Sequence, residues 1–103
     1  MKNRFLNSRQ CELLAHRGDK ASIDILINAL SASDPLQVRV ADYALGLVES
    51  VEGVARIRHH LFRAPLAVQR NHAALYFKRR GLRDILEEAL EAGAIDAVQA
   101  RSR

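Results

Sequence analysis

The residue types that usually form metal sites lie apart from one another along this chain. It contains four histidines and one cysteine. His59 and His60 are adjacent, so on a helix their side chains would point roughly 100° apart and could not share a metal ion. His16, His72 and Cys11 are distant from this pair, and none of the five residues has the spacing of zinc ligands. We therefore expect no metal site and no cofactor.

The same residues give little sign of covalent catalysis. Cys11 stands in the segment SRQCELL without an identifiable general base, and we expect it to fill a small buried position because it matches Ala41 thirty residues later. Neither a glycine-rich phosphate loop nor a Ser–His–Asp signature is recognisable. Glu87, Glu88 and Glu91 have a spacing that is typical of a solvated acidic helix face. The sequence thus predicts a protein that is not an enzyme.

Positive charge is concentrated in the middle of the chain. Residues 51–83 hold eight Lys and Arg and one Glu, a net charge of +7, whereas residues 84–103 have a net charge of −3. This segment could bind nucleic-acid phosphates, attract an acidic protein, or form a solvated face at helix C-termini. Aromatic residues make up only 5% of the chain, which leaves few side chains for stacking on single strands. The predicted basic patch comprises Arg56, Arg63, Lys78, Arg79, Arg80 and Arg83.

The elements that would position these residues follow from a repeat of thirty residues. DPLQVRVADYAL, which begins at Asp34, agrees at five positions with APLAVQRNHAAL thirty residues later, and both of the chain's prolines coincide. DILINAL and DILEEAL, sixty residues apart, are identical at five of seven positions. Proline fits the first turn of a helix, so we expect Asp34 to be the N-cap of a helix that begins at Pro35, and Ala64, a poorer N-cap, to precede a helix that begins at Pro65. Each unit is therefore predicted to be a helix, a short turn that ends in proline, and a second helix.

These signals predict seven short helices in a single domain. The apolar residues are mainly Ala, Leu, Val and Ile, which favours close-packed helices over sheets. Gly18, Gly53 and Gly81 stand near expected junctions, where positive φ ends a helix. Within domain 1–103 we expect an N-terminal capping helix (1–20), two repeats (21–50 and 51–80) and a C-terminal capping repeat (81–103). The expected helices span residues 3–17, 21–31, 35–50, 53–63, 65–80, 82–92 and 94–101.

The segment LINALSASDPLQVRVADYALGLV resembles the short HEAT-like repeats of the phycobilisome-lyase type. The resemblance is strong for residues 23–48 and partial for residues 53–77. It implies an all-α, right-handed α-α superhelix, an armadillo-like solenoid of about three helical hairpins. Such repeats serve many unrelated partners, so the resemblance implies no activity. The matching residues are Ala29-Leu30, Asp34-Pro35, Val38-Arg39, Ala41 and Ala44-Leu45-Gly46.

Two apolar stripes are predicted on the helix that begins at Pro35. One stripe, which contains Val38, Ala41, Leu45 and Val48, is expected to be buried. The apolar residues of the preceding helix are expected to pack with it: Ile23, Leu26, Ile27 and Leu30. The other either packs between neighbouring repeats or, with its counterparts thirty residues on, lines a concave partner-binding groove. The predicted groove residues are Leu36, Val40, Tyr43, Leu47, Arg70, Ala73 and Phe77.

These observations predict a small protein-binding adaptor or scaffold. The first ten residues lack the apolar core of a signal peptide, and no run of about 18 apolar residues is present, so we expect a cytoplasmic protein without membrane contact. The expected partner is a protein with apolar and acidic groups. Three alternatives stay open: a nucleic-acid-binding module that uses the basic patch, an accessory subunit of a larger enzyme complex, and self-association.

Overall fold

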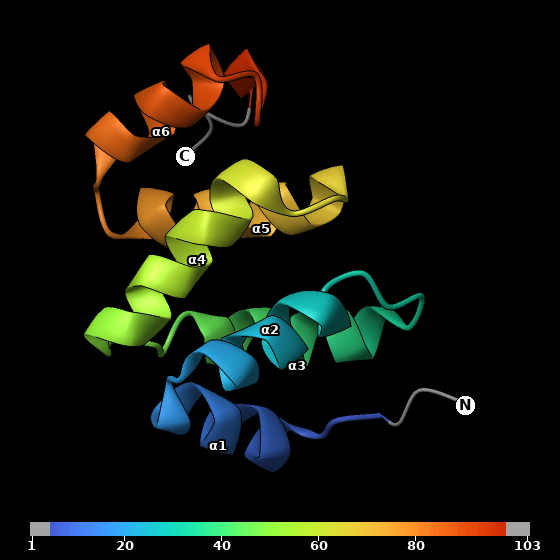
Figure 1. Ribbon diagram of the computed structural model, residues 1–103. Coiled ribbons are helices and arrows are strands. Elements are labelled where there is room, and N and C mark those ends of the chain that lie inside the picture. Colours follow the sequence, from blue (N-terminus) through green and yellow to red (C-terminus); the bar gives the residue numbers. More distant parts are fainter. Residues whose placement is uncertain (1–4, 99–103) are drawn as a thin grey trace. The chain divides into compact units, whose positions relative to one another are not determined.

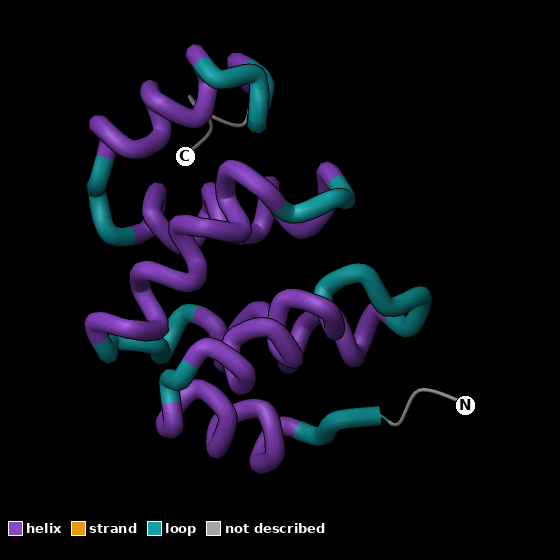
Figure 2. Tube along the Cα trace, in the orientation of Figure 1, coloured by secondary structure: helices purple, strands orange, loops and turns teal. Residues whose placement is uncertain are grey.

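The chain is all-α over the part that the structure, a computed structural model, describes, which is residues 5–98 (Figure 1). Helices and connecting turns account for all of these residues, and no strand is found among them (Figure 2). This confirms the all-α prediction. The seventh helix predicted over 94–101 extends beyond the described residues. The helices that lie wholly within the described residues are α1 (Ser8–Arg17), α2 (Lys20–Ala29), α3 (Pro35–Leu45), α4 (Val51–Arg63), α5 (Ala67–Arg79) and α6 (Arg83–Glu91).

Local hydrogen bonds explain where α1 and α3 begin. The Asn7 side chain accepts from the Gln10 backbone N–H, and the Gln10 side chain accepts from the Asn7 N–H, a reciprocal capping box. Helix α1 therefore starts at residue 8 rather than at residue 3. Asp34 caps α3 as predicted, since its carboxylate accepts from the Leu36 N–H at 2.9 Å, and Pro35 occupies the first helical position.

The start of α5 differs from the prediction. Pro65 was expected in the first turn of this helix, with Ala64 as its cap, but α5 starts at Ala67 and its N-cap is Leu66. The Gln69 side chain accepts from the Leu66 N–H at 3.4 Å. The first turns of α3 and α5 are thus 32 residues apart rather than thirty. Helix α4 begins 31 residues after α2 and is three residues longer, whereas the segment that follows it (64–66) is two residues shorter than its counterpart (30–34).

The chain forms two compact units, residues 1–56 and 57–103, and the division falls within α4. In the first unit α1, α2 and α3 pack against one another. In the second unit α5 packs against α6. Ile23, Leu26, Ile27 and Leu30 of the first unit are buried, as the sequence predicted.

A tight junction in the first unit joins the turn after α1 to the start of α4. Gly18 ends α1 with a φ of 59°, as predicted. The Ser50 hydroxyl donates to the Gly18 carbonyl at 2.8 Å and accepts from the Gly53 N–H at 3.0 Å. Gly53 stands near a helix junction, as predicted, but it lies in the first turn of α4 and its φ is not positive. A Cβ on Gly53 would come within 2.5 Å of Val48 Cγ1, so close packing explains this glycine.

Candidate functional site

The second apolar stripe of α3 is exposed. Leu36 is 52% exposed, Tyr43 is 62% exposed and Leu47 is 46% exposed, whereas Val40 is half-buried. These four residues, here called the α3 stripe, follow the spacing 4, 3, 4 that places apolar side chains along a helix–helix contact. Helix α3 ends at Leu45 rather than at the predicted residue 50, so Leu47 lies in the turn that follows the helix. The opposite side of the same helix is buried through Ala41, Ala44 and Leu45. The fold thus leaves a three-turn apolar surface without cover among the described residues.

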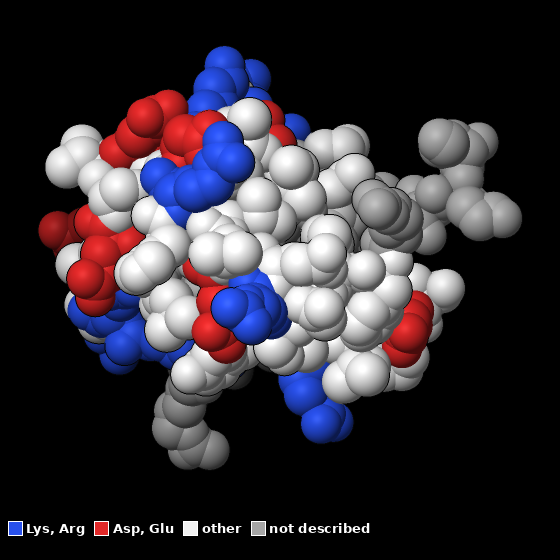
Figure 3. Space-filling view, turned by 90° about the horizontal axis from the view of Figure 1, so that it is seen from below, with Lys and Arg blue, Asp and Glu red and all other residues white. Residues whose placement is uncertain are grey.

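A hollow of about 360 Å³ extends this surface toward α1. Leu13, exposed on α1, and Leu47 form its apolar walls. Space-filling representation shows that Lys, Arg, Asp and Glu gather mainly toward one side of the face it displays, and that a broad area carries none of them (Figure 3). The hollow suits an apolar side chain that enters between polar groups. Its remaining lining residues are Arg9, Glu12, His16 and Glu49.

The α5 residues of the predicted groove do not extend the stripe. Ala73 is 0% exposed and Phe77 is 2% exposed, so both belong to the core. The spacing of thirty made them the counterparts of Tyr43 and Leu47, but the observed spacing of 32 makes Ala73 the counterpart of the buried Ala41. Phe77 likewise corresponds to the buried Leu45. The groove prediction is therefore wrong for these two residues.

Arg70, the third predicted groove residue of α5, has a structural role. Its Nε donates to the Ala94 carbonyl at 2.8 Å, and its Nη1 donates to the Ala64 carbonyl at 2.7 Å. Both acceptors are backbone groups outside the helices. The guanidinium thus links the turn before α5 to the segment after α6. Both hydrogen bonds are strengthened because their donor is charged.

The residues of the predicted basic patch do not all serve one surface. Arg56 forms two hydrogen bonds with the Asp24 carboxylate, at 2.7 and 3.1 Å, in the first unit. This bidentate pair of Arg56 and Asp24 positions α2 against α4 within the first unit. Arg58, a basic residue outside the predicted patch, pairs with Glu88 at 2.9 Å, and its guanidinium lies 5.7 Å from the centre of the Phe62 ring. Arg56 is therefore explained by the fold.

Four residues of the patch remain together at the turn between α5 and α6. Arg79, Arg80 and Arg83 are exposed, and partial burial lowers the pKa of the Lys78 ammonium. The Arg80 guanidinium lies 4.3 Å from the centre of the Tyr76 ring, a cation–π contact that holds the side chain in place. Arg63 is exposed at the end of α4, next to the turn that leads into α5. Arg63 thus lies near the N-terminus of α5, whereas the other four residues form a cationic turn at its C-terminus.

The histidines and the cysteine form no grouped site. His59 and His60 contact each other edge to face, with ring centres 5.5 Å apart. Among residues 5–98 there is no group of three or more His, Cys, Asp or Glu that could hold a metal ion. Cys11 is fully buried, as predicted, and this burial, with the nearby Glu12 carboxylate, raises the pKa of its thiol.

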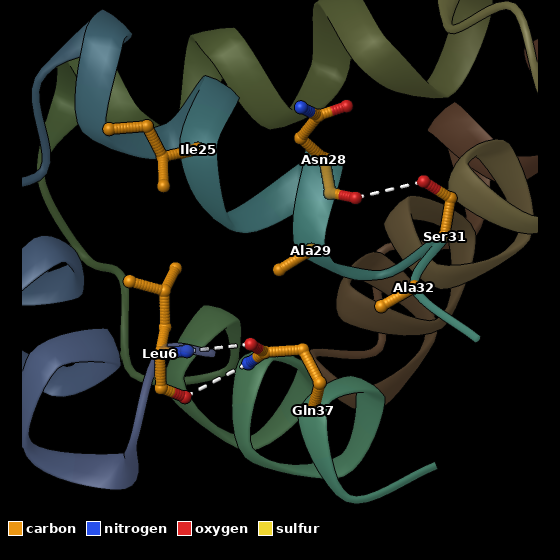
Figure 4. A pocket seen from close by; sticks show the side chains of 7 residues that line it. All are labelled: Leu6, Ile25, Asn28, Ala29, Ser31, Ala32 and Gln37. Atoms are coloured by element: carbon orange, nitrogen blue, oxygen red, sulfur yellow. Dashed lines mark hydrogen bonds between the residues drawn. The ribbon is translucent and has the colours of Figure 1, made fainter. Parts of the chain in front are cut away.

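A site that the sequence did not indicate lies between the segment before α1, the second half of α2 and the start of α3 (Figure 4). It is a cleft of about 340 Å³. Gln37, only 5% exposed, accepts from the Leu6 N–H at 2.7 Å and donates to the Leu6 carbonyl at 2.9 Å. A glutamine in the first turn of a helix normally signals a capping box, so its long-range role was not predictable. The other lining residues are Ile25, Asn28, Ala29, Ser31 and Ala32.

Comparisons with known proteins add no relative: no family model, curated protein or solved structure matches this chain. Between residues 5 and 98, none of the helices has the length and apolar character needed to cross a lipid bilayer.

Proposed function

We propose that this protein is a non-enzymatic adaptor that binds a partner protein on the α3 stripe. The observation that carries the proposal is the exposure of Leu36 and Tyr43 on one side of α3, whose other side is buried, together with the exposure of Leu47 just after the helix. The stripe's spacing suits an amphipathic helix of the partner, which would bury its own apolar face. The hollow beside Leu13 would receive one of the partner's side chains. Rigid α3 loses little conformational entropy on association.

The fold resemblance enters the same proposal. We propose that the helical hairpins belong to a short HEAT-like solenoid, in which α1, α3 and α5 are the second helices of successive hairpins. Support comes from the repeated glutamine in the first turn of each of these three helices, at positions 10, 37 and 69. Solenoids bind partners along surfaces formed by successive helices, which agrees with a binding role for α3.

Tyr43→Asp is expected to weaken partner binding at least tenfold. Tyr43 is the most exposed residue of the α3 stripe, and an aspartate would have to be desolvated in an apolar contact. The partner would be captured by a photo-crosslinker at position 43 in nuclease-treated host lysate, and its affinity for the full chain would then be measured by titration.

The control for this experiment is Leu90→Asp, which places the same charge at an exposed apolar position of α6. We expect it to leave the affinity unchanged. Equal affinities of the Tyr43→Asp variant and the original chain would show that the partner does not use the α3 stripe.

A second candidate function rests on the cationic turn between α5 and α6. Lys78, Arg79, Arg80 and Arg83 lie within six residues, and three of them are exposed. Clustered cations neutralise phosphates and release counterions, which is the basis of salt-dependent nucleic-acid binding. This alternative requires no apolar surface, so the two functions can be tested separately.

Replacing Lys78, Arg79 and Arg80 by Glu is expected to abolish nucleic-acid binding if the turn contacts phosphates. The slope of log K against log salt for the original chain should include about 2–3 units from these three cations. The matched control replaces three exposed arginines of the first unit, Arg9, Arg17 and Arg39, by Glu. It therefore changes the net charge by the same amount. Equal losses in both variants would indicate a general charge effect and reject the turn as the site.

A further inference from the structure

The segment before α1 is held as a bound peptide would be. Gln37 Oε1 and Nε2 bond the N–H and the carbonyl of the same residue, Leu6, as a neighbouring β-strand does. Leu6 and Ile25 point toward one another across the cleft, and the Ala29 methyl group points into the same space from one side (Figure 4). The site therefore recognises an extended backbone together with one apolar side chain.

Gln37 differs from the two glutamines at the same position of the other helices. Gln10 and Gln69 both accept from the backbone N–H of their own N-cap residue. Gln37 instead reaches across to Leu6, and Asp34 alone caps α3. Without Leu6, the Gln37 amide could turn back to the Asp34 N–H and complete a capping box. After release of Leu6, the buried Gln37 Oε1 would therefore still accept a hydrogen bond. This lowers the free-energy cost of releasing the segment before α1.

We propose that Phe5–Leu6 is a releasable strap over a peptide-binding cleft, and that an extended peptide carrying an apolar side chain binds there in its place, while Asn7 continues to cap α1. Gln37 would bond the backbone of the incoming residue, and Ile25 and Ala29 would contact its side chain. The cleft volume, about 340 Å³, is at the lower end of the range for ligand sites, which suits a short segment. This site is separate from the α3 stripe, so either proposal can fail without the other.

The test uses the full chain and a labelled peptide of sequence Arg-Phe-Leu-Asn-Ser, which reproduces residues 4–8. Leu6→Pro removes the N–H that Gln37 accepts and the leucine side chain, so it weakens the strap and leaves Gln37 intact. We expect this variant to bind the peptide about tenfold or more tightly than the original chain, because the competing strap has lost a hydrogen bond and its apolar contact. A peptide with proline in place of leucine should not bind.

The variant Gln37→Met distinguishes peptide binding at the cleft from non-specific peptide binding. It should release the strap and also fail to bind the peptide, whereas the matched change Gln69→Met on α5 should behave like the original chain. Equal peptide affinity of Gln37→Met and Leu6→Pro would overturn the proposal, as would the absence of saturable binding to Leu6→Pro at millimolar peptide.

The single cysteine gives an independent measure of strap release. The Cys11 thiol is fully buried and donates to the Leu6 carbonyl, with a sulfur–oxygen distance of 3.7 Å. Thiol labelling should therefore be about tenfold faster in Leu6→Pro and Gln37→Met than in the original chain or Gln69→Met, with helical content by circular dichroism retained. Labelling rates that are equal in all four proteins would show that the strap does not open.

Discussion

Leu45→Ala is expected to destabilise the protein by about 2–5 kcal/mol. Leu45 is 1% exposed on the buried side of α3, so its truncation removes apolar contacts and leaves a cavity. Leu36 lies in the first turn of the same helix and is 52% exposed. Leu36→Ala should therefore change the free energy of unfolding by only about 0.5 kcal/mol. Denaturant unfolding followed by circular dichroism measures both values.

This pair of substitutions also tests the basis of the proposed function. The proposal requires that the α3 stripe is uncovered in the free protein. Losses of similar size for Leu36→Ala and Leu45→Ala would mean that the stripe is packed in solution. A partner could then not bind on it, and the adaptor proposal would lose its supporting observation.

Gly18→Ala is expected to destabilise the protein by about 2–4 kcal/mol. An alanine at a φ of 59° costs about 1 kcal/mol. Its Cβ would also come unacceptably close to the Ser50 hydroxyl and would disrupt the junction between α1 and α4, and overpacking of this kind typically adds about 1–3 kcal/mol. Thermal unfolding and denaturant titration would measure the loss.

Gly81→Ala isolates the backbone contribution. Gly81 has a φ of 72°, but a Cβ there would meet no atom within 4 Å. We expect a loss of about 1 kcal/mol from the conformation alone. If Gly18→Ala costs no more than Gly81→Ala, then the junction adjusts to an added methyl group and contributes little to the stability of the first unit.

Local sequence signals predicted several helix boundaries well. Asp34 and Pro35 define the start of α3, and Gly18 defines the end of α1, because the hydrogen bonds and backbone angles involved lie within a few residues. The buried face of α2 was predicted for the same reason, since its apolar residues recur at helical spacing. The burial of Cys11 followed from its match with Ala41 thirty residues on.

Identical residues in two similar segments differ in burial where the elements that pack against them differ. DILINAL and DILEEAL are nearly identical, yet Ile25 is 45% exposed and its counterpart Ile85 is buried. The same limit affected α5, whose start lies two residues beyond the position that the repeat predicts, so that Ala73 and Phe77 lie in the core. A shift of two residues rotates a helix face by roughly 200°, enough to exchange exposed and buried positions.

The amino-acid sequence by itself determined that the chain is helical, where α1 ends and α3 begins, and which side of α2 is buried. Each of these depends on interactions within a few residues, which are written in local spacing. Tertiary structure alone decided that the α3 stripe stays exposed, that Arg56 and Arg70 serve the fold, and that Gln37 holds Leu6. The hydrogen bonds of Gln37 with Leu6, of Arg56 with Asp24 and of Arg70 with Ala94 join residues between 24 and 32 positions apart, because a side chain's role is fixed by which neighbour the packing brings to it.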